Sequence, residues 1–478
     1  MSFNSLQFIL FLPVVFALYW YVFKKLRNQN WFLAAASVLF YACWDWRFSL
    51  LLVFTTLCSY GTGLALERLV TRRKRMWMSA ANIVVNLLIL GFFKYYNFFA
   101  DSFADLLRMM GFLPDFPTLQ VILPVGISFY TFQALSYSID VYRRKVQATH
   151  RLDAFMAYVT FFPQLVAGPI ERATTLLPQM QRARSFDYEI AADGCRQMLW
   201  GFVKKIVVAD NCAVAVDMIW GNYASMGGVQ LLLGALLFSF QIYADFSGYS
   251  DIAQGCARLF GINLKANFAY PYFSRNIGEF WRRWHMSLMR WFRSYVYIPL
   301  GGNRDSVNKT LRNIMIVFLL SGLWHGANWT FLVWGAYHGL LMCVALLAGW
   351  DRRYNSVVGA GGWLKTSELY GMFLTYILVV LGWIFFRSSS LAEAEGYLSH
   401  MISHINITTI TVGHRAAMYS FLLLVTDWTC RRREHVLQLN FGGLFQYRWG
   451  RWLLYYGLVF LIIYELHQSQ QAFIYFQF

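Results

Sequence analysis

Long apolar runs separated by short polar stretches dominate this chain. The first runs cover about residues 6–23, 31–45, 48–66, 76–93 and 119–139. Later runs cover about residues 228–246, 313–331, 332–349, 367–385, 416–429 and 452–466. A membrane-spanning helix needs about 20 predominantly apolar residues. The pattern therefore predicts an all-α polytopic membrane protein with about eleven transmembrane helices.

Basic residues gather where alternate runs end. Clusters at residues 24–27, 72–75 and 143–145 follow the first, third and fifth runs. Cytoplasmic loops of membrane proteins carry an excess of Lys and Arg. All three clusters fall on the inside if the first run is a retained span with its N-terminus outside. The positive charge follows this run instead of preceding it, which is atypical of a cleaved signal peptide.

Composition supports a membrane protein and argues against a nucleic-acid-binding one. The chain is 58% hydrophobic and 14% charged, with a formal net charge of +17. Such a basic bias is typical either of nucleic-acid binding or of the cytoplasmic flanks of membrane spans, and the apolar content favours the flanks. The longest polar loop, at about 387–415, is short for a soluble domain. We therefore expect a single membrane domain over residues 1–478, with no nucleic-acid partner.

Two apolar regions do not fit a simple span. Residues 155–180 contain three prolines, which predicts a re-entrant or broken helix, tolerated at membrane depth only where protein or a water-filled cavity covers it. Lys204 and Lys205 interrupt the next apolar pattern. Their side chains could reach to the membrane surface, lie at the interface, or border a cavity.

Residues 279–302 combine arginines and aromatic rings. On a helical wheel the rings occupy one half and the charged residues the other, including Arg282, Arg283, Arg290 and Arg293. This pattern predicts one amphipathic helix in the membrane interface, ending before the proline at 299. His285 falls on the apolar half. Wheel geometry alone favours a buried structural histidine with a hydrogen-bond partner over a functional one.

A second histidine lies deep in an apolar run. His325 follows the start of its run by twelve residues, which places it roughly 18 Å along a helix and close to mid-bilayer. A turn at about 326–329 is needed to fit two spans here. An ionisable residue at that depth is a functional-site candidate, and histidine suits a general base. His338, thirteen residues on, is expected to pack or to support the site.

Several motifs together resemble the membrane-bound O-acyltransferase (MBOAT) family. They are "EFWRRWHMSLMRWFRSYVYIPLGGNR" with "GLWHGANWTFLVWGAYHG", and also "LPVGISFYTFQALSYSIDVYRRK", "FFPQLVAGPIER" and "DFSGYSDIAQGCARLFGINLKANFAYPY". The resemblance is strongest to the bacterial branch of alginate O-acetylation and teichoic acid D-alanyl transfer, and weakest after about residue 350. It implies helices around a central tunnel, with His325 catalytic and His285 the second family position.

The resemblance also implies an activity and its partners. We expect an O-acyltransferase, best described as an O-acetyltransferase, in the bacterial inner membrane. Its donor would be acetyl-coenzyme A or another cytoplasmic acyl thioester, and no bound cofactor or metal is expected. A periplasmic acyltransferase partner would esterify an exopolysaccharide or envelope polymer, with alginate-like acetylation the first choice. His325 could act as general base or as a transient acyl carrier.

A wider set of residues is expected to bind the donor or line the tunnel: Arg282, Arg283, Trp284, Trp324, Asn328, Asp245, Ser247 and Tyr249. For the arginines, binding to lipid headgroups is an equal alternative to binding coenzyme phosphates. For Asp245, at the expected inner end of a span, a solvated boundary is as good an interpretation as a tunnel wall.

Two other functions fit the same pattern of spans and buried polar groups. One is a polytopic transporter or flippase of an envelope glycan precursor. The other is a lipid acyltransferase with its acceptor in the bilayer. A transporter should partly tolerate His325→Gln and build a substrate gradient, whereas a transferase should lose ester formation.

Overall fold

A computed structural model describes residues 1–112, 121–166, 168–350, 354, 358, 365–405, 411–438, 443–466 and 471–474. Every secondary-structure element among these residues is helical. The chain forms two compact units, one of Met1–Ala191 with Cys256–Lys265 and one of Ala192–Gly255 with Ala266–Phe478. A single domain over the whole chain stays a prediction.

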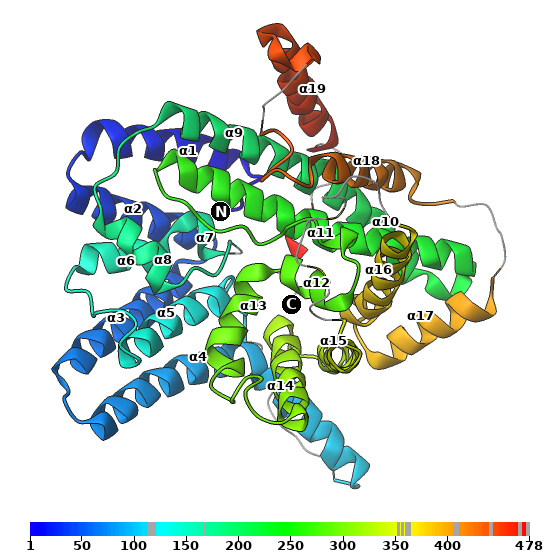
Figure 1. Ribbon diagram of the computed structural model, residues 1–478, viewed down its shortest axis with the longest axis horizontal. Coiled ribbons are helices and arrows are strands. Elements are labelled where there is room, and N and C mark those ends of the chain that lie inside the picture. The colour runs from blue at the N-terminus through cyan, green and yellow to red at the C-terminus, as the bar shows by residue number, and fades with distance from the viewer. Residues whose placement is uncertain are drawn as a thin grey trace. The chain divides into compact units, whose positions relative to one another are not determined.

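The first unit is built from helices that follow the early apolar runs. They are α1 (Leu6–Ala17) with the π turn η1 (Leu18–Val22), α2 (Leu26–Ala42), α3 (Trp46–Arg68), α4 (Arg72–Met109) and α5 (Ile127–Tyr142). α3, α4 and α5 lie side by side (Figure 1). Buried Arg75 donates hydrogen bonds to the carbonyls of Leu66, Val141 and Tyr142 at 2.6, 3.0 and 3.0 Å. It thereby satisfies backbone groups left open at the ends of α3 and α5.

Two expected boundaries in this unit were wrong. α4 continues to Met109, well beyond the expected end at 93. α5 begins only at Ile127, because the preceding Gly126 has a left-handed φ of +75°. A side chain at Gly126 would lie 2.7 Å from the Leu165 carbonyl oxygen, so this position suits glycine. The first part of the run expected at 119–139 lies outside the described residues.

The proline-containing region is a broken helix, as the sequence predicts. It consists of α6 (Leu152–Thr160), α7 (Phe162–Leu165) and α8 (Ala173–Gln181). A further basic pair, at 352 and 353, also fits the inner side of the expected topology, but it lies outside the described part of the chain.

The second unit begins with one long, locally widened helix. α9 (Tyr188–Phe202) runs through the π turn η2 (Val203–Ala209) into α10 (Asp210–Gly221), followed by the short η3 (Tyr223–Ser225). α11 (Gly228–Leu259) is longer than the run expected at 228–246. Asp245 therefore lies inside the helix and not at its end, and it is buried. The alternative of a solvated boundary was wrong.

The predicted amphipathic helix is interrupted. After η4 (Pro271–Phe273) the chain forms α12 (Ile277–Arg283), α13 (Met286–Phe292) and the π turn η5 (Arg293–Tyr297). The break falls at His285, whose φ is +41°. The prediction of one continuous helix over this stretch was therefore wrong, because a residue in the left-handed conformation cannot continue a right-handed helix.

Most of the remaining elements follow the later apolar runs, but the helix at Leu391–Ser403 lies within the loop that was expected at about 387–415. They are α14 (Val307–His325), α15 (Trp329–Leu347), α16 (Thr366–Arg387), α17 (Leu391–Ser403), α18 (His414–Cys430), η6 (Gly443–Gln446) and α19 (Arg448–Leu466). The turn expected at 326–329 is confirmed. α14 and α15 pack along each other (Figure 1) and carry the centre of the site described below.

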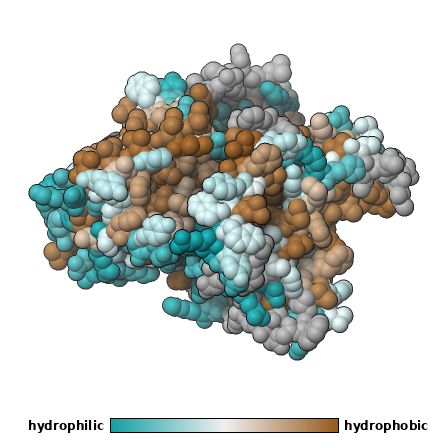
Figure 2. Space-filling model, turned by 90° about the horizontal axis from the view of Figure 1, so that it is seen from above, coloured by the Kyte–Doolittle hydropathy of each residue, from teal (hydrophilic) through white to brown (hydrophobic). Residues whose placement is uncertain are grey.

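Much of the surface is apolar. Among the described residues, five helices are long and apolar enough to cross a membrane, namely α3, α4, α11, α15 and α16. Figure 2 shows extensive apolar surface on one face. Large apolar side chains lie exposed, for example Leu10, Leu88, Phe373 and Phe460, each more than half exposed. Such surface suits contact with lipid. The expected number of about eleven spans is not confirmed.

Candidate active site

His285 occupies a strained turn between α12 and α13. Its φ and ψ are +41° and +52°, in the left-handed region, where residues other than Gly are uncommon but His is enriched. Backbone hydrogen bonds hold this turn from both sides. Met286 N donates to the Asn267 carbonyl oxygen at 2.9 Å, and Ala269 N donates to the Arg283 carbonyl oxygen at 3.0 Å. The turn places the His285 side chain in the interior, where it is 1% exposed.

The side chain of Asn267 also supports this turn. Its Nδ2 donates to Ser250 Oγ of α11 at 3.1 Å, and its Oδ1 accepts from Ser287 N at 3.4 Å. Asn267 is fully buried, so these bonds form away from solvent. It therefore ties α11 to the start of α13 immediately beside His285.

His325 is the last residue of α14 and is also buried. The chain can turn directly after it because Gly326 has no side chain, and the Phe331 ring occupies that space. Asn328 then caps α15, accepting from Thr330 N at 3.0 Å and donating to the Ser389 carbonyl oxygen at 2.7 Å. Through these two hydrogen bonds to backbone atoms, Asn328 stabilises the turn that follows His325.

The rings of His285 and His325 lie close together. Their centres lie 6.4 Å apart with an interplanar angle of 62°. At this separation the imidazoles cannot hydrogen-bond to each other directly, but an oxygen atom placed between them could contact both. Trp324 lies beside both rings, 5.7 Å from His285 and 4.9 Å from His325. Residues from a broken helix and from a helix end therefore converge on one place.

Aromatic rings enclose the pair. Phe246 of α11 lies 4.6 Å from His285, while Trp334 of α15 and Phe386 of α16 lie 5.1 and 5.2 Å from His325. Burial lowers the pKa of His285 to about 3, since a charged imidazole is poorly solvated there. At neutral pH His285 is therefore a neutral ring with one donor and one acceptor nitrogen.

Trp284 and Arg283, both expected to bind the donor or line the tunnel, contact other side chains of the fold. The Trp284 ring packs against Phe268 and Trp383, with ring centres 5.1 and 5.0 Å away. Arg283 forms an ion pair with Glu279 at 2.7 Å. The expectation that Arg283 belongs to an open basic face was therefore wrong, because its charge is engaged within the fold.

Lys204 and Lys205 lie in the π turn η2 and form ion pairs with different carboxylates. Lys205 Nζ lies 2.8 Å from Asp210 and 3.0 Å from Asp245. Lys204 Nζ lies 2.5 Å from Asp251. All five side chains are buried. The interpretation that the lysine side chains reach to the membrane surface was therefore wrong.

Ser247 and Tyr249 of α11 lie around this ion cluster and are also buried. Ser247 Oγ accepts a hydrogen bond from Lys204 Nζ at 3.3 Å. Tyr249 packs against Phe473, with ring centres 4.7 Å apart. Ile474 N donates to Asp245 Oδ2 at 2.7 Å. The segment 471–474 thus packs on α11, and Phe473 also reaches Phe246, 6.1 Å away, behind His285.

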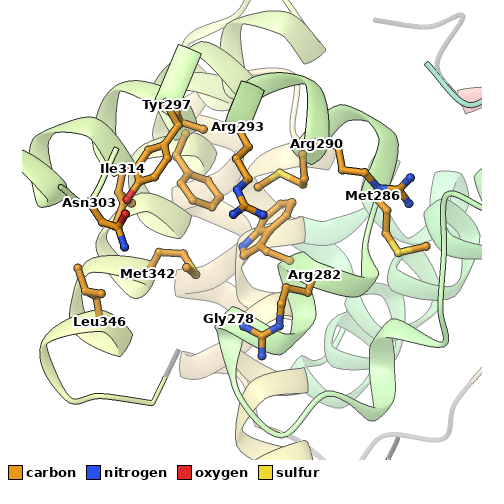
Figure 3. A pocket seen from close by; sticks show the side chains of 14 residues that line it. Gly278, Arg282, Met286, Arg290, Arg293, Tyr297, Asn303, Ile314, Met342 and Leu346 are labelled. Carbon is orange, nitrogen blue, oxygen red and sulfur yellow. The ribbon is translucent and has the colours of Figure 1, made fainter. Parts of the chain in front are cut away.

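A half-open pocket of about 330 Å³ lies on the other side of α12. Its lining comes from α12, α13, η5, the loop after η5, α14 and α15 (Figure 3): Gly278, Trp281, Arg282, Met286, Met289, Arg290, Arg293, Tyr297, Asn303, Ile314, Val317, Phe318, Met342 and Leu346. Three of the four arginines assigned to the basic face are here. The sequence did not predict the methionines, because nothing in a wheel distinguishes a pocket wall from a lipid-facing surface.

The comparisons with known proteins agree with the motifs. The model of the membrane-bound O-acyltransferase family matches residues 144–355. The probable alginate O-acetylase AlgI of Pseudomonas aeruginosa is 40% identical over 435 residues, covering 88% of this chain and 81% of that protein. The peptidoglycan O-acetyltransferase of Helicobacter pylori is 31% identical, covering 100% and 97%. The teichoic acid D-alanyltransferase of Bacillus subtilis is 27% identical, covering 57% and 71%.

Proposed function

The chain belongs to the membrane-bound O-acyltransferase family, and on this premise we propose that His325 and His285 form its acyl-transfer site. The protein is a multi-pass membrane O-acyltransferase. The relatives are named for acetyl and D-alanyl transfer, which favours a transferase over a transporter. The observation that carries the site assignment is the 6.4 Å separation of the two rings inside an aromatic enclosure.

The geometry suits general base catalysis. The acceptor hydroxyl lies between the rings and gives its proton to a nitrogen of His325 while its oxygen attacks the acyl carbonyl carbon. Neutral His285 donates a hydrogen bond to the carbonyl oxygen as negative charge develops there. The carbon–sulfur bond of the thioester then breaks, and the leaving thiolate takes up the proton held by His325, which returns to its neutral form. If His325 instead carries the acyl group transiently, the same two rings take part in two successive transfers.

The donor in this proposal is an acyl thioester from the cytoplasm, with acetyl-coenzyme A the first choice. It requires no bound cofactor. About eleven helices in the bacterial inner membrane would surround a tunnel that leads from the donor side to the acceptor side. Trp324 lies where such a tunnel would pass the histidines, whereas Asn328, Asp245, Ser247 and Tyr249 support the walls of the site.

The proposed acceptor is an extracytoplasmic polysaccharide, reached with a periplasmic acyltransferase partner. Relatives named alginate O-acetylase reach 40% identity, which favours an alginate-like exopolysaccharide. Peptidoglycan acetylation is a second candidate, because the relative named for it matches over the whole length of this chain.

The test is a transfer assay with purified, reconstituted protein, radiolabelled acetyl-coenzyme A and the co-expressed periplasmic partner. Release of coenzyme A and label in alginate or in peptidoglycan are measured for wild type and His325→Ala. Turnover in wild type and none in a folded mutant supports the site. Equal turnover in both removes His325 from the chemistry. The polymer that carries label decides between the two acceptors.

A further inference from the structure

We propose that His400 and His404, at the C-terminal end of α17, form a binding site for a divalent transition-metal ion such as Cu²⁺ or Zn²⁺. The site is separate from the two catalytic histidines, and the inference does not depend on the proposed function. It rests on the spacing of the two residues, on the position of their rings and on the hydrogen bonds of the neighbouring Ser403.

The two histidines occupy one turn of the chain. His404 N donates to the His400 carbonyl oxygen at 3.1 Å, so the pair keeps the i, i+4 relation of a helix although α17 ends at Ser403. Residues four apart lie on one face of a helix, and histidines at this spacing can bind the same metal ion. Their rings are stacked, with centres 3.9 Å apart and an interplanar angle of 17°. The fold therefore gathers two imidazoles at one place.

The hydrogen bonds of Ser403 determine which nitrogen of His404 carries the proton. Ser403 Oγ donates its single proton to the Ser399 carbonyl oxygen at 2.8 Å. It also lies 2.8 Å from His404 Nδ1, and in this second bond it can only accept. The neutral ring therefore has its proton on Nδ1 and a lone pair on Nε2. An outer hydrogen bond of this kind fixes the tautomer of metal-binding histidines and orients the other nitrogen.

Both rings can be reached by an ion from outside. His404 is exposed and His400 is partly exposed. Bonds between Zn²⁺ and histidine nitrogen are about 2.0–2.1 Å long, so the two rings must turn toward one point, which accessible side chains can do by rotation about their own bonds. Among the residues that the structure describes, no group of three or more potential ligands forms. Water would therefore complete the coordination of the ion.

The pair sits on a firmly held helix. The Tyr397 ring stacks on Trp220 with ring centres 4.1 Å apart, and its hydroxyl donates to the Leu231 carbonyl oxygen at 2.6 Å. Gly228 N, at the start of α11, donates to the His404 carbonyl oxygen at 2.7 Å. Ligands on a backbone that is already fixed lose less freedom when they bind, which favours affinity.

The ligand type selects the class of metal. Imidazole nitrogens suit Cu²⁺, Ni²⁺ and Zn²⁺, whereas Mg²⁺ and Ca²⁺ prefer oxygen ligands. For a given nitrogen site the affinity is highest for Cu²⁺. We therefore expect Cu²⁺ to bind more tightly than Zn²⁺, and Mg²⁺ not to compete with either.

The experiment titrates Cu²⁺ into the full-length protein in detergent, purified with an affinity tag that contains no histidine. Electron paramagnetic resonance reports the nitrogens bound to the copper. Wild type should show two imidazole nitrogens at one equivalent. His400→Ala and His404→Ala should each show one nitrogen and bind about tenfold more weakly or worse. His150→Ala removes an exposed histidine from another part of the chain and should match wild type.

Ser403→Ala tests the assignment of the proton. It leaves both ligands in place and removes the acceptor for the Nδ1 proton of His404. It should keep two nitrogens on the copper and weaken binding about tenfold, as is typical when a group that orients a ligand is lost. An affinity equal to that of wild type would contradict the role given to Ser403.

Two results would overturn the site itself. One is equal Cu²⁺ affinity in wild type, His400→Ala and His404→Ala, because the copper would then be bound elsewhere. The other is a wild-type spectrum with fewer than two imidazole nitrogens at one equivalent. Circular dichroism without metal checks that each variant keeps its helices. His400→Gln and His404→Gln, which keep a polar side chain, replace any alanine variant that does not.

Discussion

The histidine site and the arginine pocket are built from the same elements but differ in nearly every physical property. Both use the α12–η5 segment, α14 and α15. The first is buried, ringed by aromatic side chains and contains a neutral imidazole. The second is half-open and carries exposed arginines. A dry site strengthens interactions with charge that develops during reaction, whereas exposed cations attract and hold an anionic ligand.

The difference indicates that acyl transfer takes place in the histidine site and that the donor is recognised in the arginine pocket. If it is correct, substitutions in the histidine site should lower kcat, and substitutions in the arginine pocket should raise KM for the donor. Substitutions at four positions test this division, in order of decreasing expected effect.

His325→Ala should lower kcat by about three orders of magnitude or more, because no other group replaces a base at the end of α14. Donor affinity should stay within about twofold of wild type. The measurement is steady-state release of coenzyme A together with a binding isotherm. The matched control is His150→Ala at an exposed histidine. A loss of donor affinity as large as the loss of kcat would show that donor binding and acyl transfer share one site.

His285→Asn and His285→Ala should both lower kcat about a hundredfold, since each removes the proposed donor to the carbonyl oxygen. They should differ in stability. Asn accepts the left-handed conformation, whereas Ala should lose roughly 1 kcal/mol there. Thermal unfolding in detergent measures this difference.

The pH profile provides a check on His285. Because its pKa is lowered to about 3, the wild-type ring stays neutral above about pH 5. His285→Asn should therefore keep the wild-type shape of the profile of kcat/KM above that pH. A wild-type acid limb that disappears in His285→Asn would show that His285 itself titrates in that range.

Arg293→Gln should raise KM for the donor about tenfold and change kcat by less than twofold. The effect should shrink at high salt, because exposed charges are screened. Arg304→Gln, at an exposed arginine outside the lining of the pocket, provides the control. An effect on kcat alone would place Arg293 at the reaction centre and break the comparison.

Asn267→Ala should have the smallest effect on kcat/KM, a few-fold decrease that comes from kcat, with a loss of about 1–3 kcal/mol in stability. It removes the hydrogen bonds to Ser250 and Ser287 that hold the turn before α13. Ser250→Ala and the double mutant complete a cycle. If the turn is held through the Asn267–Ser250 bond, the double mutant should lose less than the sum of the single losses.

The sequence predicted the parts of this molecule that depend on local pattern. The end of α14 at His325 and the start of α15 at Trp329 follow from run length and glycine positions. The broken helix between residues 152 and 181 follows from its prolines. Such features are set within a few residues of the chain, so a single sequence is enough to show them.

The parts that depend on distant residues were not predictable from pattern. A wheel assumes an unbroken helix, so it could not reveal the turn at His285, which is held by the backbone of Asn267 and Ala269. Phe386 reaches His325 from a region where the resemblance to known motifs is weak. The Lys205 ion pairs likewise needed the three-dimensional arrangement, because Asp245 lies forty residues further along the chain.

The π turn at Val203–Ala209 has a consequence for how the chain tolerates length changes. A π turn contains more residues than an α turn, and here it lets adjacent lysines meet separate carboxylates. Removing one residue would relax the turn to an ordinary α-helix, in which Lys204 and Lys205 would no longer both be placed to reach their separate carboxylates. Single-residue deletions at 203–209 should therefore be selected against more strongly than most substitutions there, and homologous chains should conserve its length even where its side chains vary.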